Sequence, residues 1–248
     1  IVLAGLRGDI FARGGELLAT SIELYSIYAQ RDEIDDPDRV AAILAPALGM
    51  RRVELRARLE GERFTYLRRK APPDVTAAVR ALVARHKLAG INYLKESKRF
   101  YPHKSLAAQT IGAVNMENEG LFGIERAYEQ WIAGPQGTHY AVRDGFGYVL
   151  GSRGAVMNNP ARGDDIVLTI DWGLQYAAEE ALRAAVTQSE ALGGVVVVMD
   201  PLTGDVLAIS NFPTPHPNHT HTPHFPSHLT IPAHTPAPTP VTVPQPLP

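Results

Sequence analysis

The sequence of 248 residues has no cysteine, which excludes disulfide frameworks, thiolate zinc sites and cysteine nucleophiles. It also lacks any apolar run of the roughly 18 residues that a membrane-spanning helix needs, and it shows no signal peptide. The formal net charge is only −2, so a strongly basic nucleic-acid-binding protein is not expected. With 45% hydrophobic residues, the chain has enough apolar material for a packed core.

Charged residues are missing altogether from residues 213–248, which contain 12 prolines, 7 threonines and 6 histidines. So much proline prevents helices and strand ladders, and few large apolar side chains are available for a core. We therefore predict a disordered tail and a folded part that ends near Phe212. The tail histidines are irregularly spaced and have no carboxylates to orient them, so no functional metal site is expected.

Motifs that would name a reaction are absent as well. There is no phosphate-binding glycine loop, no HExxH and no G-x-S-x-G. Glu179 and Glu180 are neighbours on a predicted helix, where side chains diverge by about 100°, so a solvated face is expected rather than an acid–base pair. The basic runs at 68–70 and 95–99 are short and predict a solvated or partner-facing surface. The residues alone indicate no cofactor.

What is present predicts a mixture of helices and strands. Strands are expected over 16–30 and 63–67. Helices are expected from Pro37 to Gly49, around 53–59, and from Pro73 to just before Gly90. Asp36 followed by Pro37 is typical of a helix start, and Gly49 of a helix end.

The second half of the chain continues the mixture. We predict helices over 106–114 and 121–132, then strands over 138–170 with turns at Asp144-Gly145 and at 158–160. Asp165–Ile170 is predicted as a strand, and Asp171 should begin a helix that reaches about Ala191. The apolar face of this helix comprises Leu174, Ala178, Leu182, Ala185 and Val186. Strands at 195–199 and 206–209 should form a hairpin, and the order of elements predicts an α+β fold.

A series of short strings stands in order over about residues 7–218. The strings are Arg7-Gly-x-Ile10, Arg13-x-Gly15, Leu18-Ala19, Tyr28-Ala29, Asp36-Pro37, Glu96-x-x-Arg99-x-Tyr101-Pro102, Ala107-Ala108, Ile111-Gly112, Gly120-Leu-x-Gly-Ile-Glu125, Tyr128, Leu168-Thr-Ile-Asp171, Leu174-Gln175, Val198-Met-Asp-Pro-x-Thr-Gly204, Leu207-Ala208, Phe212-Pro213 and Pro217-Asn218. Their shared order and spacing resemble the class B penicillin-binding proteins, and the division-type peptidoglycan transpeptidases most of all. Ala12 departs from the family, which usually has Asp there, and a looser turn is expected.

The resemblance implies three parts: a pedestal, or dimerization domain, over residues 1–160, the first strand, helix and hairpin of a transpeptidase domain over 161–212, and the low-complexity tail over 213–248. It also implies a membrane anchor upstream of Ile1 and a place on the periplasmic side of the bacterial inner membrane. The implied partners are a polymerase glycosyltransferase and other division proteins. The partner-binding or structural residues that it indicates are Arg7, Gly8, Arg13, Gly15, Lys98, Arg99, Gly123 and Glu125, of which residues 7–15 and 98–99 are the contact candidates.

The reaction of the resembled family needs residues that this chain lacks. In that family a serine attacks the penultimate D-Ala carbonyl of a stem peptide, and an amine from a neighbouring strand resolves the acyl-enzyme. β-Lactams mimic the D-Ala-D-Ala substrate. The S-x-x-K, S-x-N and K-[TS]-G strings of this machinery are absent, and Lys104 is the last lysine. We therefore predict no catalytic residue and an inactive chain.

Two explanations of the tail stay open. A frameshift or related truncation is favoured, because out-of-frame reading of a GC-rich gene yields proline, histidine, threonine and alanine codons; a natural disordered tail is the alternative. The chain is accordingly either a damaged septal D,D-transpeptidase or a non-catalytic pedestal that docks on division or elongation partners. A division-type and an elongation-type relative are not distinguished. In either case the open edge and bare apolar face of the hairpin predict aggregation.

Overall fold

The computed structural model describes the chain except for residues 1, 4, 136, 140–155, 159–160 and 215–248. The elements in chain order are β1 (Val2–Leu3), β2 (Ile10–Phe11), β3 (Leu17–Gln30), η1 (Arg31–Glu33), α1 (Pro37–Leu48), α2 (Arg52–Glu60), β4 (Phe64–Ala71), α3 (Pro73–His86), β5 (Ile91–Phe100), α4 (Ala108–Ile111), β6 (Ala113–Val114), β7 (Gly120–Phe122), α5 (Gly123–Ala127), α6 (Glu129–Ile132), β8 (Gly137–His139), β9 (Val156–Asn158), β10 (Ile166–Val167), α7 (Trp172–Gln188), β11 (Gly194–Met199) and β12 (Val206–Phe212). This mixture confirms the predicted α+β class.

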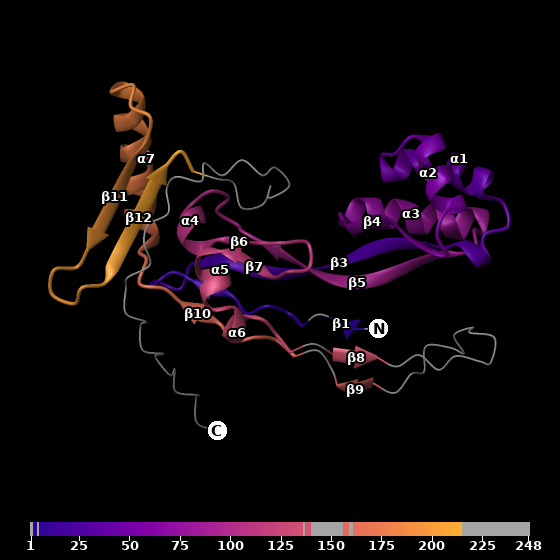
Figure 1. The fold of residues 1–248 in the computed structure, drawn as a ribbon, viewed down its shortest axis with the longest axis horizontal. Helices are drawn as coiled ribbons and strands as arrows, with labels where there is room; N and C mark the ends of the chain where they lie inside the picture. Colours follow the sequence, from indigo (N-terminus) through magenta and orange to yellow (C-terminus); the bar gives the residue numbers. More distant parts are fainter. Residues whose placement is uncertain (1, 4, 136, 140–155, 159–160, 215–248) are drawn as a thin grey trace.

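A long antiparallel arm dominates the first hundred residues. β3 pairs with β5 without a break from Thr20↔Phe100 to Ala29↔Ile91, and the far half of β3 also pairs with β4. Helices α1, α2 and α3 gather over the far end of this arm (Figure 1). The core between helices and sheet consists of Ile27, Ala29, Ile34, Val40, Ala41, Leu44, Ala45, Leu48, Leu55, Leu59, Leu67, Ala71, Val79 and Ile91.

Local signals set the ends of α1 as predicted. The Asp36 side chain accepts a hydrogen bond from the backbone N–H of Arg39 at 3.0 Å, and Pro37 is the first helical residue. Gly49 ends the helix with a φ of 67°, which glycine adopts without strain. The predicted strands at 16–30 and 63–67 and the helices at 53–59 and after Pro72 are likewise confirmed by β3, β4, α2 and α3.

The base of the arm closes where distant segments meet. β2 pairs antiparallel with β3, with Ile10 opposite Ala19, and parallel with β10, with Ile166 opposite Ile10. A second core lies here and consists of Ile10, Ala12, Leu18, Ala19, Tyr101, Ala107, Ile111 and Ile132. Residues 10–11 and 166–167, which lie before and after the arm in the sequence, are therefore side by side.

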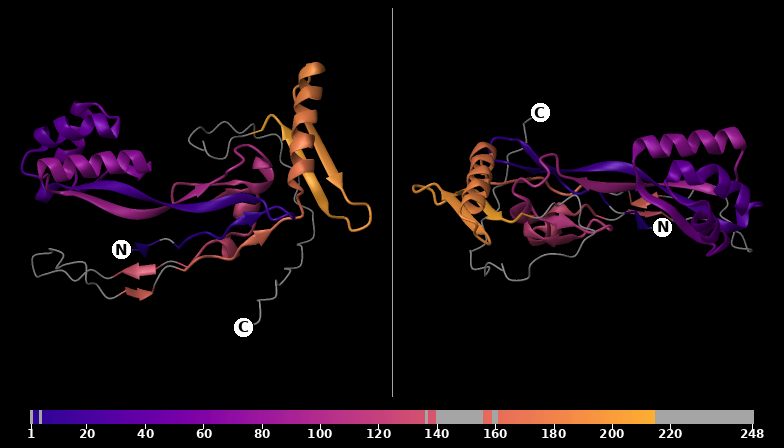
Figure 2. Two further views of the ribbon diagram at one scale, coloured as in Figure 1. Left: turned by 180° about the vertical axis from the view of Figure 1, so that it is seen from behind. Right: turned by 90° about the horizontal axis from the view of Figure 1, so that it is seen from above.

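The last described unit is α7 with the hairpin of β11 and β12, which confirms the predicted hairpin. Asp171 caps α7 by accepting from the N–H of Leu174 at 3.0 Å. Ala178, Leu182 and Val186 are buried, and α7 packs mainly on β12. Figures 1 and 2 show this unit and helices α1–α3 at opposite ends of an elongated molecule.

Several predicted elements differ in the structure. The helix expected over 106–114 is limited to α4, because Gly112 takes a φ of 92° and the chain then enters β6. The helix expected over 121–132 begins only at Gly123, after strand β7, and is divided into α5 and α6. The strand expected over 165–170 is limited to β10.

Further differences concern β5 and α7. Strand β5 was not predicted, and α7 ends at Gln188 rather than near Ala191. Leu174 and Ala185 are exposed, whereas Gln175 is buried on the face that packs on the hairpin. The predicted turns at Asp144-Gly145 and at residues 159–160, and the predicted tail from residue 215 on, lie outside the described residues.

Candidate functional site

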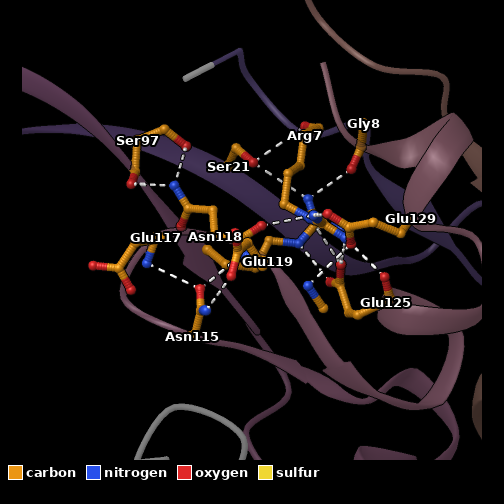
Figure 3. Close-up of polar contacts among 12 residues, drawn as sticks. Arg7, Gly8, Ser21, Ser97, Asn115, Glu117, Asn118, Glu119, Glu125 and Glu129 are labelled. Carbon is orange, nitrogen blue, oxygen red and sulfur yellow. Dashed lines mark hydrogen bonds and ion pairs between the residues drawn. The ribbon is translucent and has the colours of Figure 1, made fainter. Parts of the chain in front are cut away.

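A buried ion-pair cluster occupies the base of the arm. It consists of Arg7, Arg99, Glu125 and Glu129 and is called the Glu125 cluster below (Figure 3). The Glu125 side chain is 0% exposed, and Nε and Nη2 of Arg7 donate to its Oε2 at 3.0 and 2.8 Å. Nη1 of Arg7 donates to Oε1 of Glu129 at 2.9 Å. These charge-assisted bonds join the segment before β2 to α5 and α6.

Arg99 reaches the same carboxylate from the end of β5. Its Nε donates to Oε1 of Glu125 at 2.6 Å, and its Nη1 donates to the carbonyl oxygen of Gly8 at 2.6 Å. Its Nη2 is buried without a hydrogen-bond partner. Two guanidinium groups thus share one buried carboxylate, and the half-exposed Glu129 supplies the second negative charge.

Burial and charge set two protonation states in this region. Burial alone would lower the pKa of Arg7, but its contacts with Glu129 and Glu125 outweigh burial and raise the pKa. Burial strongly raises the pKa of Tyr101, and the charge of Glu125 raises it further. The Tyr101 hydroxyl donates to Oε1 of Glu125 at 3.4 Å. Arg7 therefore stays charged and Tyr101 neutral, which suits a scaffold rather than a proton-transfer site.

Glycines allow the backbone segments beside the cluster to touch. Gly112 has a φ of 92°, and a Cβ atom there would lie 1.9 Å from the carbonyl oxygen of Phe122. Gly123 has a φ of 65°, and a Cβ atom there would lie 2.7 Å from Cα of Gly112. A Cβ atom on Gly8 would lie 1.8 Å from the carbonyl oxygen of Asp164. Only glycine fits these close approaches, which explains its place in three of the strings.

Asn118 connects the cluster to the arm (Figure 3). Its carbonyl oxygen accepts from Nη1 of Arg7 at 2.7 Å, and its Nδ2 donates to the carbonyl oxygen of Ser97 at 2.8 Å. Nζ of Lys70 donates to Oδ1 of Asn118 at 3.0 Å and to the carbonyl oxygen of Met116 at 2.5 Å. Burial lowers the pKa of Lys70 to about 8, although nearby Glu96 acts in the opposite direction. Both contacts of Nζ are to neutral oxygens.

The side chains of Glu96 and Arg99 lie on opposite faces of β5, because residues three apart on a strand point to opposite sides. Glu96 pairs with Nη2 of Arg69 at 2.6 Å and accepts from the Ser26 hydroxyl, whereas Arg99 turns to Glu125. Burial acts to raise the pKa of Glu96, but the bonds from Arg69 and Ser26 outweigh it and lower the pKa. The two residues are therefore structural on separate faces.

Arg13 and Gly15 lie in the tight turn between β2 and β3. Gly15 donates its N–H to the carbonyl oxygen of Ala12 at 3.0 Å, and Ala12 donates to the carbonyl oxygen of Glu16 at 2.8 Å. Ala12 is 0% exposed and belongs to the second core, and the looser turn expected at this position stays a prediction. The Arg13 side chain is exposed, while its N–H donates to the carbonyl oxygen of Ile170 at 2.9 Å.

Glu179 links α7 to the base of the arm. Its Oε1 accepts from the backbone N–H of Ala107 at 2.7 Å and from Nε2 of Gln175 at 2.8 Å. The prediction that Glu179 lies on a solvated face is therefore wrong. Glu180 is exposed as predicted and pairs with Arg183 at 2.7 Å.

Comparison with known proteins identifies the fold around this cluster. The Penicillin-binding Protein dimerisation domain family matches residues 3–168, which include β2 to β10. The chain is 35% identical over 216 residues to the Probable peptidoglycan D,D-transpeptidase PbpC of Pseudomonas aeruginosa, a match covering 86% of this chain and 37% of that protein. It is 32% identical over 220 residues to the Peptidoglycan D,D-transpeptidase FtsI of Escherichia coli, covering 86% and 36%.

The chain belongs to the class B penicillin-binding proteins. It spans a little over a third of the length of these curated relatives. The fold agrees with a solved structure, Penicillin Binding Protein 2X from Streptococcus thermophilus, at a TM-score of 0.66 and 22% identity over 89% of this chain and 36% of that one.

Most of the predicted site residues of this class B penicillin-binding protein meet at the base of the arm. Arg7, Gly8, Arg99, Gly123 and Glu125 lie in or beside the Glu125 cluster. Of the two roles named for Arg99, partner-binding or structural, the geometry favours the structural one, because its side chain is 1% exposed and bound to Glu125. Its neighbour Lys98 is exposed on β5.

Sequence reasoning missed three contributors to this penicillin-binding protein scaffold: Lys70, Asn118 and Glu129. Glu129 follows Glu125 at a spacing of four, which is a usable helical signal for a shared face. Asn118 has a φ of 64°, a conformation that asparagine tolerates better than most residues. Nothing local marks Lys70, which stands in a basic run and is buried by the 116–118 loop.

The described residues contain no group of three or more His, Asp or Glu side chains that could hold a metal ion. Within the same residues, no helix has the length and apolar character to cross a membrane. The tail histidines lie outside the described residues. Within the described residues, the charged side chains of the Glu125 cluster bond to one another. At the base of the arm, the described residues thus present a buried ion-pair cluster.

Proposed function

We propose that the chain is the pedestal of a peptidoglycan D,D-transpeptidase, continued by the first strand, helix and hairpin of the transpeptidase domain over 161–212. The observation that carries this proposal is the double attachment at the base of the arm. β10, which precedes α7, pairs with β2, and the Glu179 carboxylate of α7 accepts from the backbone N–H of Ala107. A strand pairing and a side-chain hydrogen bond therefore join the base of the arm to the segment that carries the hairpin. Two such attachments would hold a second domain at a fixed angle to the arm.

The parent activity follows from the relatives, which are peptidoglycan D,D-transpeptidases by name. A parent of this type cross-links stem peptides through a serine acyl-enzyme in septal cell-wall synthesis, anchored on the periplasmic side of the inner membrane. The printed chain has no S-x-x-K, S-x-N or K-[TS]-G string, and residues 213–248 carry no charge. We propose that a frameshift or related truncation replaced the catalytic part, so that this chain forms no acyl-enzyme.

Labelling with a fluorescent penicillin tests the absence of acylation. We expect no covalent band from the chain, with Escherichia coli FtsI labelled in parallel as the positive control and boiled FtsI as the negative one. A saturable covalent band on the chain would overturn the proposal that its nucleophile is absent.

A chimera tests the pedestal itself. Residues 1–212 of this chain would be joined to the part of FtsI that follows its matching hairpin. We expect the chimera to bind fluorescent penicillin, because the hairpin supplies the first strands of the catalytic sheet. A soluble, folded chimera that binds none would contradict the assignment of 161–212 to the transpeptidase domain.

A second candidate function is a non-catalytic pedestal that docks on a polymerase glycosyltransferase or other cell-wall synthesis proteins. The exposed side chain of Lys98 on β5 favours it, since its charge forms no ion pair within the part of the chain that the structure describes. Co-purification with a glycosyltransferase should weaken on K98E and persist on R85E, a matched reversal at an exposed position of α3. Equal recovery of both variants would remove Lys98 from the interface.

A further inference from the structure

The segment ahead of β3 is hydrogen-bonded along its length to a segment that comes much later in the chain. Residues 6–13 run parallel to residues 162–170, in the register that pairs Leu6 with Arg162 and Ile10 with Ile166. The backbone bonds between them run from the N–H of Gly163 to the carbonyl oxygen of Leu6 at 2.8 Å, from Ile166 to Asp9 at 2.8 Å, from Leu168 to Phe11 at 2.8 Å and from Arg13 to Ile170 at 2.9 Å.

Side chains hold the earlier segment in place as well. Arg7 is bound inside the Glu125 cluster, and the carbonyl oxygen of Gly8 accepts from Nη1 of Arg99 at 2.6 Å. The Asp9 carboxylate pairs with Arg162 at 2.6 Å. Charge-assisted bonds are stronger than neutral ones, and those from Arg7 to Glu125 are buried. The segment is therefore fixed by ion pairs in addition to its backbone bonds.

The parallel direction of the two segments decides how they respond to tension. Figures 1 and 2 show β1 and α7 on opposite sides of β10. A pull on the beginning of the chain therefore draws residues 6–13 toward β1, and a pull on α7 draws residues 162–170 the other way. Both pulls act along the strands in opposite directions, so the bonds between the segments are loaded together rather than one after another.

We propose that residues 6–13 and 162–170, called the clamp below, carry tension between the beginning of the chain and α7. Residues 14–161 then lie outside the path of the tension, and the arm keeps its fold under load. This inference rests on the proposed function, in which an anchor ahead of the chain and a transpeptidase domain after the hairpin attach the two ends to the membrane and to the cell wall.

The arm itself is poorly placed to resist such a load. Its two long strands are antiparallel, and β3 begins where β5 ends, with Thr20 opposite Phe100 at the base. Tension applied across the base would separate β3 from β5 one pair at a time, starting from this end. The clamp is therefore the part of the fold that has to hold if the arm is to stay folded.

Single-molecule pulling tests the clamp on the full chain, because the absence of cysteine lets handles be attached at chosen positions. In the first geometry, the handles are on a cysteine added ahead of Ile1 and on G173C, an exposed position at the start of α7. This geometry pulls the clamp along its strands. In the second geometry, A161C replaces G173C at an exposed position just ahead of residue 162, so that the clamp is opened from one end. We expect a rupture force several-fold higher in the first geometry.

The extension at rupture tests whether the arm is shielded. When the clamp yields in the first geometry, residues 14–161 are released, which corresponds to roughly 500 Å of extended chain. We expect no lengthening from the arm before this event. E129Q removes one ionic partner of Arg7 and should lower the rupture force, since forced unfolding follows the unfolding rate. E180Q, which removes only an exposed pair with Arg183, should leave the force unchanged.

Three results would each overturn the proposal. They are equal rupture forces in the two geometries, lengthening of the arm before the clamp yields, and the same rupture force for E129Q and E180Q. The comparison of geometries needs no variant of the Glu125 cluster, so it stands even where such a variant folds poorly. None of these measurements involves penicillin binding, and a weak clamp and an inactive chimera are therefore separate outcomes.

Discussion

The Gln175 side chain bonds to both backbone groups of Ile209. Its Oε1 accepts from the Ile209 N–H at 2.9 Å, and its Nε2 donates to the Ile209 carbonyl oxygen at 2.9 Å. The amide thus takes the place that a neighbouring strand would have along β12. Gln175 is 0% exposed, so no water replaces these bonds.

We expect Q175A to destabilise the α7 and hairpin unit by about 1–3 kcal/mol, because it leaves a part-buried N–H and a part-buried C=O of Ile209 unpaired. Hydrogen exchange at the amide of Ile209 should accelerate, and urea unfolding should show the loss of stability. Q188A, at an exposed position near the end of the same helix, is the control and should stay within about 0.5 kcal/mol of the parent. Unchanged exchange at Ile209 would show that the amide contacts are dispensable.

E125Q should lower the free energy of unfolding by about 3–5 kcal/mol. The amide keeps the shape of the side chain but leaves Arg7 and Arg99 without their shared negative charge. Thermal and urea unfolding followed by circular dichroism measure this loss. The matched control is E180Q, which removes only an exposed pair with Arg183 and should cost about 0–1 kcal/mol. Similar losses for both variants would mean that the Glu125 cluster adds nothing beyond a surface ion pair.

Stability should rise with pH through the titration of Lys70. Its folded pKa, about 8, lies below the ordinary value of 10.5. Between these values the unfolded chain binds the extra proton, so the free energy of unfolding increases by at most about 1.4 kcal/mol per pH unit from this group. Below pH 8 both states are protonated, and the contribution is flat.

K70M removes the titrating group and should flatten the curve between pH 8 and 10 relative to the parent chain. K98M, which replaces an exposed lysine on the same arm, should keep the parental slope. Urea midpoints at four or five pH values provide the comparison. A parental slope in K70M would assign the dependence to another group.

Gly112 and Gly15 separate backbone strain from steric overlap, because both have a φ of 92°. Nothing lies within 4 Å of a Cβ atom placed on Gly15, so G15A should cost only the strain of about 1–2 kcal/mol. G112A adds a steric overlap with the Phe122 carbonyl oxygen and should lower the free energy of unfolding by about 3–5 kcal/mol. Urea unfolding of the two variants measures the difference. Equal costs would mean that the 120–123 backbone yields easily.

The elements that were predicted correctly carry their own local signals. Asp36, Pro37 and Gly49 mark both ends of α1, and the turn from Asp200 to Gly204 marks the hairpin. β5 was missed because its residues 91–100 include four charged side chains, and their burial is decided elsewhere in the chain. A strand that supplies ion pairs to both its faces does not show the apolar alternation on which strand prediction rests.

The site residues were found more reliably than their roles. The strings around Arg7, Arg99 and Glu125 name residues that meet in the structure, but a basic run suggested an exposed surface for Arg99. Its partner Glu125 lies 26 positions later, and Gly8 lies 91 positions earlier. No local sequence pattern indicates contacts between residues that are so far apart in the chain. Glu179 was misjudged for the same reason, since its partner Ala107 is 72 positions away.

The wide sequence separation within the Glu125 cluster sets an order of assembly during synthesis. All strands of the arm have been synthesised once Phe100 has left the ribosome. The partner of Arg7, Glu125, is synthesised 118 residues after Arg7, and the partner of Ile10 is Ile166. Because closing such long loops carries an entropic cost and the N-terminal part of a chain emerges first, the arm is able to fold before its base is sealed. A nascent chain stalled so that Phe100 has cleared the ribosome and Glu125 has not should therefore already carry a protease-resistant arm, with Arg7 still exposed to solvent.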